Sequence, residues 1–392
     1  MILTLTANPS LDRTIELSGP VLRGQVQRAV WAGQQPGGKG VNVSRAVAAA
    51  DRDTLAVLPG DLDDPVLTGL DAIGLAHRSV PTGTPLRSNI TVTEPDGTTT
   101  KINEPGSPLS PQTQDELLDL VAEQAVGASW VVLAGSLPPG VDDDFYARAI
   151  KRIRQLDSPP LIAVDTSGAP LATALMASPD LIKPNAEELA ELLHAAGLLH
   201  ASGLRDDSAP RDAVEPLGAA APRDAVESLG TAELHTIAEW LEWSPQLAAR
   251  AASTLLTARG TGPRSILATL GAGGAVLAQP DTAWHAQHPP MDVVSTVGAG
   301  DCTLAGYLLG LTGGREPDAS LARAVAYGAA AARLRGTGVP SPADARTDAV
   351  TVTPLETPAA PLTGSPTSHT DAYTDDTSHR HEGTAPEAEE AR

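Results

Sequence analysis

The sequence predicts an α/β fold with a mostly parallel central sheet, helices on both faces and a small β-sheet lid. Short apolar runs alternate with longer amphipathic segments, which is the pattern of parallel strands joined by crossover helices. Buried strands are predicted for residues 2–7, 54–58, 130–134, 161–165, 181–183 and 266–270. Helices are predicted for residues 41–50, 111–126, 142–155, 186–193 and 243–259.

Two early regions, within 12–35 and 86–104, break this alternation and predict the lid. Their candidate strands are residues 13–17, 27–34, 87–93 and 98–103. The last two are joined through Pro95-Asp96-Gly97, whose residue order is a turn signal. Because these short strands have little helix to pack on, we expect a small separate sheet. Its exposed face is a candidate surface for a homodimer.

Composition narrows the class of protein. Of the 392 residues, 41% are hydrophobic but only 3% are aromatic, so the predicted core is aliphatic. The net charge of −21 argues against nucleic acid or an anionic membrane as the main partner. Cys302 is the only cysteine, which excludes an internal disulfide framework and a cysteine-rich zinc site. The polar N-terminus and the lack of a long apolar run predict a cytoplasmic protein without a signal peptide or membrane span.

One folded domain is predicted for residues 1–338, with two additions. Within residues 198–235, the segment 209–218 recurs as 221–230, a 12-residue tandem repeat. Two copies are too few to bury the core of a solenoid, so a surface insertion is predicted. Residues 339–392 are rich in Thr, Pro, Ser and Asp, and are predicted to be a disordered acidic tail because they bury too little apolar area.

The strongest chemical motif is Ser-Thr-Val-Gly-Ala-Gly-Asp-Cys-Thr-Leu-Ala-Gly at 295–306. The small residues Gly298, Ala299 and Gly300 allow a tight turn whose N–H groups converge at the start of a predicted helix, which is an anion site. Asp301 falls in the first turn, where its carboxylate can act as a base or simply cap the helix. The segment matches neither the Walker pattern nor the Rossmann pattern.

A second motif is Pro-Gly-Gly-Lys-Gly-Val-Asn at 36–42. Its glycines leave room for a polar ligand, to which Lys39 and Asn42 offer donors. Only four of the 27 basic residues are lysines, and three of these fall in or beside motifs. A compact ammonium at these positions therefore suggests a specific role.

Polar residues also follow other predicted strands, where an α/β sheet places its ligand groups. Asp12 can accept hydrogen bonds from sugar hydroxyls or form an ordinary Asx turn, and Ser136 follows a strand in the same way. Asn185 and Glu188 are three residues apart at a helix start, where they either hold a hydrated Mg²⁺ or form a capping box. The turn at 269–274 is open enough for a flat base or a phosphate.

In this order the motifs resemble the PfkB, or ribokinase-like, carbohydrate kinases. The resemblance covers roughly residues 1–338 and rests on Asn8-Pro-x-x-Asp12, Gly37-Gly-Lys-Gly-x-Asn42, Gly135-Ser136, Lys183-Pro-Asn185-x-x-Glu188, Thr269-Leu-Gly and Gly298-Ala-Gly-Asp301. TANPSLDRT, PGGKGVNVSRA, RSNITVTEPDG and LAGSLPPGV are most similar to the 1-phosphofructokinase and tagatose-6-phosphate kinase branch. Pro36 and Cys302 stand where small residues such as Ala or Ser are expected.

The resemblance implies a ribokinase-like fold and phosphoryl transfer from ATP with Mg²⁺. Asp301 would take the proton of the acceptor hydroxyl, and the N–H groups of residues 298–300 would stabilise the developing charge. The expected ATP-binding residues are Lys183, Asn185, Thr269, Gly271, Gly273, Thr296, Gly298 and Gly300. Asn185 and Glu188 would position Mg²⁺ through water.

On the acceptor side, the expected residues are Asp12, Gly38, Lys39, Asn42, Arg87, Lys101 and Ser136. Lys39, Arg87 and Lys101 form the predicted cradle for a phosphate, and this basic trio in an acidic chain favours a sugar phosphate over a free sugar. Fructose 1-phosphate is the first choice, with tagatose 6-phosphate and fructose 6-phosphate as alternatives. Two other classes are a catalytically silent sugar-phosphate sensor, opposed by the intact Asp301 motif, and a dinucleotide-dependent oxidoreductase, opposed by the missing Rossmann fingerprint.

Overall fold

The computed structural model of the protein describes residues 1–200, 202–204, 230–258 and 262–356. Their main sheet is built from β1 (Ile2–Thr6), β4 (Thr54–Pro59), β5 (His77–Val80), β8 (Trp130–Ala134), β9 (Leu161–Asp165), β10 (Leu181–Ile182), β11 (Ser265–Thr269), β12 (Ala275–Gln279), β13 (Thr282–Gln287) and β14 (Thr351–Leu355). The strand order is β14-β13-β12-β11-β10-β9-β8-β1-β4-β5. The seven strands from β11 to β5 in this order run parallel to one another, whereas β12, β13 and β14 add an antiparallel edge.

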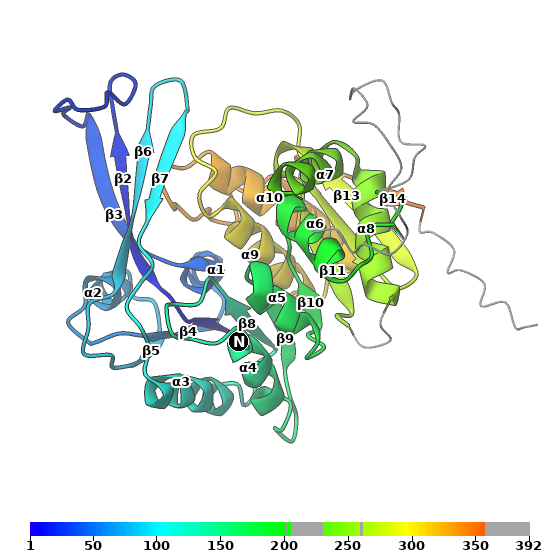
Figure 1. Cartoon of the computed structure of the whole chain (residues 1–392), viewed down its shortest axis with the longest axis horizontal. Helices are drawn as coiled ribbons and strands as arrows, with labels where there is room; N and C mark the ends of the chain where they lie inside the picture. Colours follow the sequence, from blue (N-terminus) through cyan, green and yellow to red (C-terminus); the bar gives the residue numbers. More distant parts are fainter. Residues whose placement is uncertain (201, 205–229, 259–261, 357–392) are drawn as a thin grey trace, which may run out of the picture. The chain divides into compact units, whose positions relative to one another are not determined.

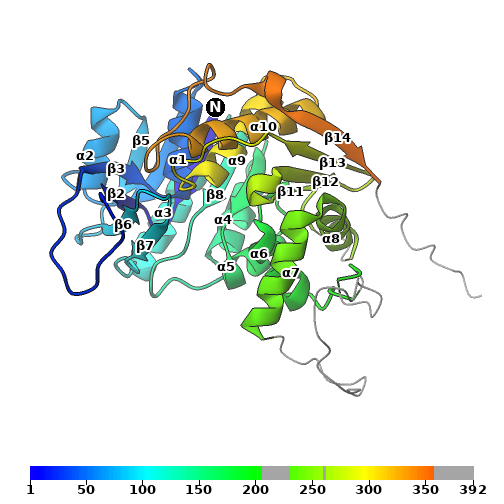
Figure 2. The ribbon, with the colours of Figure 1, turned by 90° about the horizontal axis from the view of Figure 1, so that it is seen from above.

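Helices cover both faces of this sheet. They are α1 (Lys39–Ala48), α2 (Pro65–Ala72), α3 (Pro111–Gln124), α4 (Phe145–Ile153), α5 (Gly168–Leu175), α6 (Ala186–Ala195), α7 (Thr231–Trp243), α8 (Pro245–Thr257), α9 (Ala299–Thr312) and α10 (Pro317–Ala332). Figure 2 shows α1, α9 and α10 on one side of the sheet and α4 to α8 on the other. Across the described residues, no helix combines the length and the apolar character that a membrane span needs.

The period-two pattern of the strands explains the two apolar layers. In β8, Val131 and Leu133 point into the layer formed with α3 to α8, whereas Trp130 and Val132 point into the layer formed with α1, α9 and α10. A strand buried on both faces must be apolar along its whole length, which is why these strands appear as continuous apolar runs. The predicted parallel sheet with helices on both faces is confirmed.

A second sheet contains β3 (Trp31–Gly37), β2 (Ser10–Glu16), β6 (Arg87–Thr93) and β7 (Thr99–Asn103), in that order. Figure 1 shows it as a separate blue and cyan layer beside the main sheet. The turn between β6 and β7 has Gly97 at φ 90°, a left-handed conformation that favours glycine, and the Asp96 carboxylate accepts the Thr98 N–H. The predicted small lid sheet is therefore confirmed.

Two boundaries in the sequence prediction need correction. The disordered tail was predicted from residue 339, but β14 pairs with β13 at the edge of the main sheet, so that prediction is wrong for residues 339–356. Local composition favoured disorder there, whereas pairing with an existing strand edge supplies the hydrogen bonds. The predicted insertion 198–235 extends into α7, which packs against α6 and α8. The repeat up to residue 229 and residues 357–392 lie outside the described part of the chain.

Candidate active site

The predicted site residues gather at the edge where the parallel strands of the main sheet end. Because β1, β8, β9 and β10 run in one direction, their carboxyl ends meet beside the first turns of α1 and α9. Helices α1 and α9 also pack against each other (Figure 1). A turn of small or polar residues follows each of these strands, and these turns supply the groups described below.

Asp301 lies in the first turn of α9 and is buried. Its Oδ2 accepts a hydrogen bond of 2.8 Å from Nδ2 of Asn42 on α1. Burial and the nearby Asp165 carboxylate raise the pKa of Asp301 to about 7, whereas Lys39, Asn42 and Lys183 lower it. A carboxyl group that changes protonation near neutral pH suits the role of a general base.

The N-terminus of α9 has the form that the glycine motif predicts. Gly298 is the N-cap residue with φ 78°, a left-handed conformation that favours glycine. The N–H groups of the first turn have no acceptor inside the helix, and that of Ala299 bonds back to the Thr296 carbonyl at 3.3 Å. A Cβ at Gly300 would lie 3.5 Å from Lys183 Nζ, so a positive charge lies beside this helix end. An anion fits there.

Asp165, the last residue of β9, is fully buried and brings two lysines together. Its Oδ1 lies 2.7 Å from Lys39 Nζ, and its Oδ2 lies 3.2 Å from Lys183 Nζ. Burial would raise the pKa of Asp165, but the two ammonium groups hold it below its ordinary value. Burial would likewise lower the pKa of Lys39, but Asp165, Glu188 and Asp301 raise it above its ordinary value. Lys39 therefore stays charged at neutral pH.

Asn185 and Glu188 form a reciprocal capping box at the start of α6. Asn185 Oδ1 accepts the Glu188 N–H at 2.7 Å, and Glu188 Oε2 accepts the Asn185 N–H at 2.9 Å. The helix-cap interpretation is thus confirmed for these two side chains. Glu188 Oε1 is outside the cap, 3.7 Å from Lys39 Nζ. Within the described ranges, no group of three or more His, Cys, Asp and Glu side chains is placed to hold a metal.

The turn after β11 lies next to the start of α6. Asn185 and Thr269 form a parallel bridge, and the Thr269 N–H donates to the Pro184 carbonyl at 3.0 Å. The turn continues as a short 3₁₀ segment, Gly271–Gly273. The structure thus places the turns 183–188 and 269–274 next to each other.

Asp12 lies on the inner end of lid strand β2, against the glycine motif. Its Oδ1 accepts hydrogen bonds from Ser10 Oγ at 2.7 Å and Asn89 Nδ2 at 3.1 Å. Burial raises the pKa of Asp12, although these bonds and the positive charges of Arg87 and Arg45 oppose the shift. A Cβ at Gly37 would collide with the Asp12 carboxylate, which explains the glycine there.

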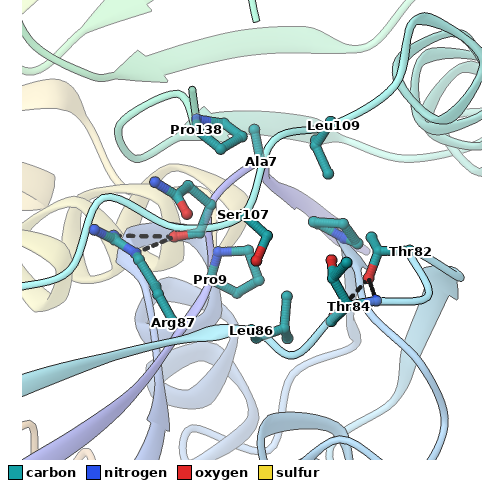
Figure 3. A pocket seen from close by; sticks show the side chains of 11 residues that line it. Ala7, Pro9, Thr82, Thr84, Leu86, Arg87, Ser107, Leu109 and Pro138 are labelled. Atoms are coloured by element: carbon teal, nitrogen blue, oxygen red, sulfur yellow. Dashed lines mark hydrogen bonds between the residues drawn. The ribbon is translucent and has the colours of Figure 1, made fainter. Parts of the chain in front are cut away.

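Arg87, at the start of β6, lines two hollows of the surface. Its Nε and Nη2 donate to the Asn8 carbonyl at 3.2 and 3.0 Å, and its Nη1 donates to the Glu104 carbonyl at 3.0 Å. Figure 3 shows Arg87 among the residues that line a small pocket of about 10 Å³. Arg87 also lines a cavity of about 590 Å³, together with Asn8, Asn103, Ser136 and Thr166.

The three cations of the predicted phosphate cradle have different neighbours in the structure. Lys39 has its ammonium against Asp165 and Glu188, whereas the charges near Arg87 are those of Asp12 and Glu104. Lys101 is exposed on β7 and pairs with Thr91, which lies four residues along β6 from Arg87, or about 13 Å. One cradle formed by all three cations therefore stays a prediction. Local sequence could not show which carboxylate would hold Lys39.

Asp165 is the site residue that sequence reasoning missed. It ends an apolar strand that was predicted correctly, and its lysine partners are distant along the chain; Lys39 is 126 residues away. One signal was available. An acidic residue at the carboxyl end of a buried parallel strand reaches the same edge as the recognised motifs.

Comparisons with known proteins agree with this geometry. A family model described as pfkB family carbohydrate kinase matches residues 5–230 and 229–344. A 1-phosphofructokinase from Haloferax volcanii is 33% identical over 353 residues, which are 89% of this chain and 96% of that protein.

Solved structures share the fold. Phosphofructokinase-2 from Escherichia coli, in complex with substrates and products, has a TM-score of 0.70 at 24% identity and covers 88% of this chain and 97% of its own. Ribokinase from Thermotoga maritima has a TM-score of 0.61 at 16% identity, with coverages of 88% and 97%. The predicted ribokinase-like fold is confirmed by these likenesses.

Proposed function

Because the chain belongs to the PfkB family of carbohydrate kinases, we propose that it phosphorylates fructose 1-phosphate to fructose 1,6-bisphosphate with ATP. The observation that carries the chemistry is the buried Asp301 carboxyl group, whose pKa is about 7, beside the N-terminus of α9. This carboxyl group combines a base suited to neutral pH with an adjacent anion site. Phosphoryl transfer needs both.

In the proposed reaction, Asp301 accepts the proton of the acceptor hydroxyl as the hydroxyl oxygen attacks the γ-phosphorus of ATP. Oδ2 is hydrogen-bonded to Asn42, so Oδ1 is the oxygen for this proton. The bond from the γ-phosphorus to the bridging oxygen breaks, and ADP leaves. The N–H groups of residues 298–300 stabilise the charge on the transferred group, at about 3–4 kcal/mol per donor. Lys183 and Lys39 supply positive charge next to it.

The proposed ATP site is the side of the cluster formed by Lys183, Asn185 and Thr269, the glycines Gly271 and Gly273, and Thr296. Mg²⁺, when bound, neutralises charge on the ATP phosphates. Glu188 Oε1, which takes no part in the capping box, and Asn185 would hold the Mg²⁺ ion through water. A single remaining carboxylate oxygen suits Mg²⁺, which usually keeps several waters and takes few protein ligands.

The proposed acceptor site is on the lid side of Asp301. Asp12, Gly38 and Asn42 would hold sugar hydroxyls, because Asn42 contacts Asp301 and Asp12 lies against Gly37 of the glycine motif. Arg87 and Ser136, which line the 590 Å³ cavity, would bind the phosphate that the acceptor already carries. Lys101 is on the same face of the lid as Arg87 and is a candidate for a further contact.

The choice of fructose 1-phosphate is supported by the 1-phosphofructokinase relative at 33% identity. Tagatose 6-phosphate and fructose 6-phosphate are the competing acceptors, because each carries a phosphate at one end and a primary hydroxyl at the other. We further propose a cytoplasmic enzyme that pairs as a homodimer through the outer face of the lid. That face carries the exposed Ile102, and a related phosphofructokinase-2 has a tetrameric inhibited form.

ADP release measured with ATP, Mg²⁺ and four acceptors tests the proposal. Fructose 1-phosphate is expected to give the highest kcat/KM, with fructose 6-phosphate and tagatose 6-phosphate below it. Free fructose is expected to be poorer by about 10- to 150-fold, because it lacks the group that Arg87 binds. A preference for another sugar phosphate would overturn the choice of acceptor. Equal use of free fructose would overturn the phosphate site.

A further inference from the structure

Arg45 on α1 is a partly buried cation whose guanidinium bonds only neutral oxygens. Its Nη1 donates to the Pro36 carbonyl at 3.2 Å, the Thr337 carbonyl at 3.0 Å and Asn42 Oδ1 at 3.2 Å. Its Nη2 donates to Gln35 Oε1 at 2.5 Å. Among the residues that the structure describes, no carboxylate forms an ion pair with it. The Asp12 carboxylate acts on it only at longer range. A partly buried charge without a direct ion pair is costly, so its presence points to a role.

The contact with Asn42 settles which way that amide faces. A guanidinium has donors and no acceptor, so only the amide oxygen of Asn42 can face Arg45. The amide nitrogen must then face Asp301, and it donates to Oδ2 at 2.8 Å. The inverted amide has nearly the same shape but would set its nitrogen against Arg45 and its oxygen against the Asp301 carboxylate. Both contacts would then be lost.

We propose that Arg45 is a positioning residue for phosphoryl transfer, because it holds the Asn42 amide in the orientation that keeps one oxygen of Asp301 bonded and the other free for the acceptor proton. This inference rests on the proposed role of Asp301 as the base. The same guanidinium joins Gln35 and Pro36, at the end of lid strand β3, to Thr337 after α10. The orientation of Asn42 is therefore tied to the position of the lid base.

The charged groups facing Asp301 come from three other places. Lys39 comes from α1, Asp165 from the end of β9, and Lys183 from the turn after β10. The Cys302 thiol adjoins Asp301 along α9, and burial raises its pKa to about 12, so it stays neutral. All these groups remain when Arg45 is replaced, so a change in the pH dependence of kcat reports on the hydrogen bond from Asn42.

The first test is the pH profile of kcat for Arg45→Met with ATP and the best acceptor. The hydrogen bond from Asn42 lowers the pKa of Asp301, so its loss moves the acidic limb to higher pH, by about 0.5 to 1 pH unit. We expect kcat to fall about 10-fold or more, with KM for ATP within about threefold. Guanidinium ion at millimolar concentration is expected to restore part of kcat to Arg45→Ala.

Arg154→Met is the matched control. Arg154 is also a partly buried arginine that bonds carbonyls, those of Pro160 and Ser178, but it lies at the other edge of the sheet beside Asp180. Its loss is expected to lower thermal stability and leave the pH limb unchanged. If Arg45→Met does not fold, Arg45→Lys replaces it. A point-like ammonium cannot hold all four oxygens, so kcat should still fall, about threefold or more.

A double variant separates positioning from general damage. If Arg45 acts through Asn42, Arg45→Met should change kcat little further in an Asn42→Ala background. Fully additive losses, an unchanged acidic limb, or a failure of guanidinium to restore any activity to folded Arg45→Ala would each overturn the inference. If Asp301→Asn kept its activity, the proposed base would fail instead. If Asp301→Asn is inactive but Arg45→Met keeps the acidic limb of the wild-type pH profile, only the proposed role of Arg45 is overturned.

Discussion

Two buried aspartates at opposite edges of the main sheet differ in what surrounds them. Asp180 precedes β10 at the amino edge, where its Oδ2 accepts bonds from Arg154 at 2.6 Å and from the Ile162 N–H at 2.8 Å. Arg264 Nε lies 3.3 Å from its Oδ1. Arg154 is itself fixed by backbone carbonyls. This charge cluster joins the ends of neighbouring strands and faces no catalytic group.

At the carboxyl edge, Asp165 is also paired with two cations, but these are lysines. Lys39 and Lys183 lie 2.7 and 3.2 Å from its two oxygens, and Asp301 is close enough for its pKa to respond. An ammonium is a compact charge on a flexible stem, whereas a guanidinium is a planar fork suited to fixed geometry. An aspartate paired with two cations therefore occurs at both edges of the sheet. At the amino edge the cations are arginines, of which Arg154 also bonds backbone carbonyls, and at the carboxyl edge they are lysines beside Asp301.

The largest expected effect is that of Asp301→Asn. The amide keeps the size of the side chain but cannot accept the acceptor proton, so kcat should fall by about 10²- to 10⁴-fold. KM for ATP and for the sugar phosphate should stay within about tenfold, as measured by steady-state kinetics. Asp318→Asn, in the exposed first turn of α10, is the control and should be close to wild type. More than about a tenth of wild-type kcat in Asp301→Asn would rule out the base.

Asp165→Asn and Asp180→Asn test the comparison directly. Each leaves two cations without their carboxylate, and we expect each to lower the free energy of unfolding by about 3 kcal/mol in chemical denaturation. Of these two aspartates, only Asp165 raises the pKa of Asp301, in addition to the effect of burial. The wild-type kcat should fall as the pH drops below about 7, because Asp301 becomes protonated. Asp165→Asn should move this limb to lower pH, whereas Asp180→Asn should not. If the two variants had the same pH profile of kcat, the proposed difference between the two edges of the sheet would be wrong.

Arg87→Ala has a smaller expected effect, confined to the acceptor. Loss of a charge-assisted hydrogen bond to the acceptor phosphate should lower kcat/KM for the sugar phosphate by about 10- to 150-fold, with little change for ATP. Arg13→Ala is the control, because Arg13 is exposed on β2 three positions from Ser10, the register partner of Arg87, and lies on the opposite face of the lid. Equal losses for fructose 1-phosphate and free fructose would show that the phosphate site is misplaced.

The smallest effect is expected from shortening the chain. Removal of residues 357–392 should leave kcat and the melting temperature unchanged, because the sheet ends at β14. Removal of 341–392 also deletes β14 together with the half-buried Val350 and Val352, whose side chains pack on the core, so it should cost about 2 kcal/mol of stability. Thermal melts of both truncations decide this. Identical melts would mean that β14 adds nothing to the sheet.

Local pattern was enough to predict most of the fold. The strands 130–134 and 161–165 and the helix 111–126 follow from periodicity and flanking turn residues, which act over a few positions. The lid also followed from short polar strands and the Pro95-Asp96-Gly97 turn. Strand β14 was missed because its sequence has the composition of the tail, and only an available strand edge makes it a strand.

The sequence by itself determined where the motifs fall, since each depends on residues next to one another: the glycines before α1 and α9, the turns after the strands, and Asp301 in a first helical turn. Only the tertiary structure decided how these groups pair. It placed Lys39 against Asp165 and Asn42 against Asp301. The physical reason is that ion pairing and burial depend on distance in space, and these partners are 126 and 259 residues apart along the chain.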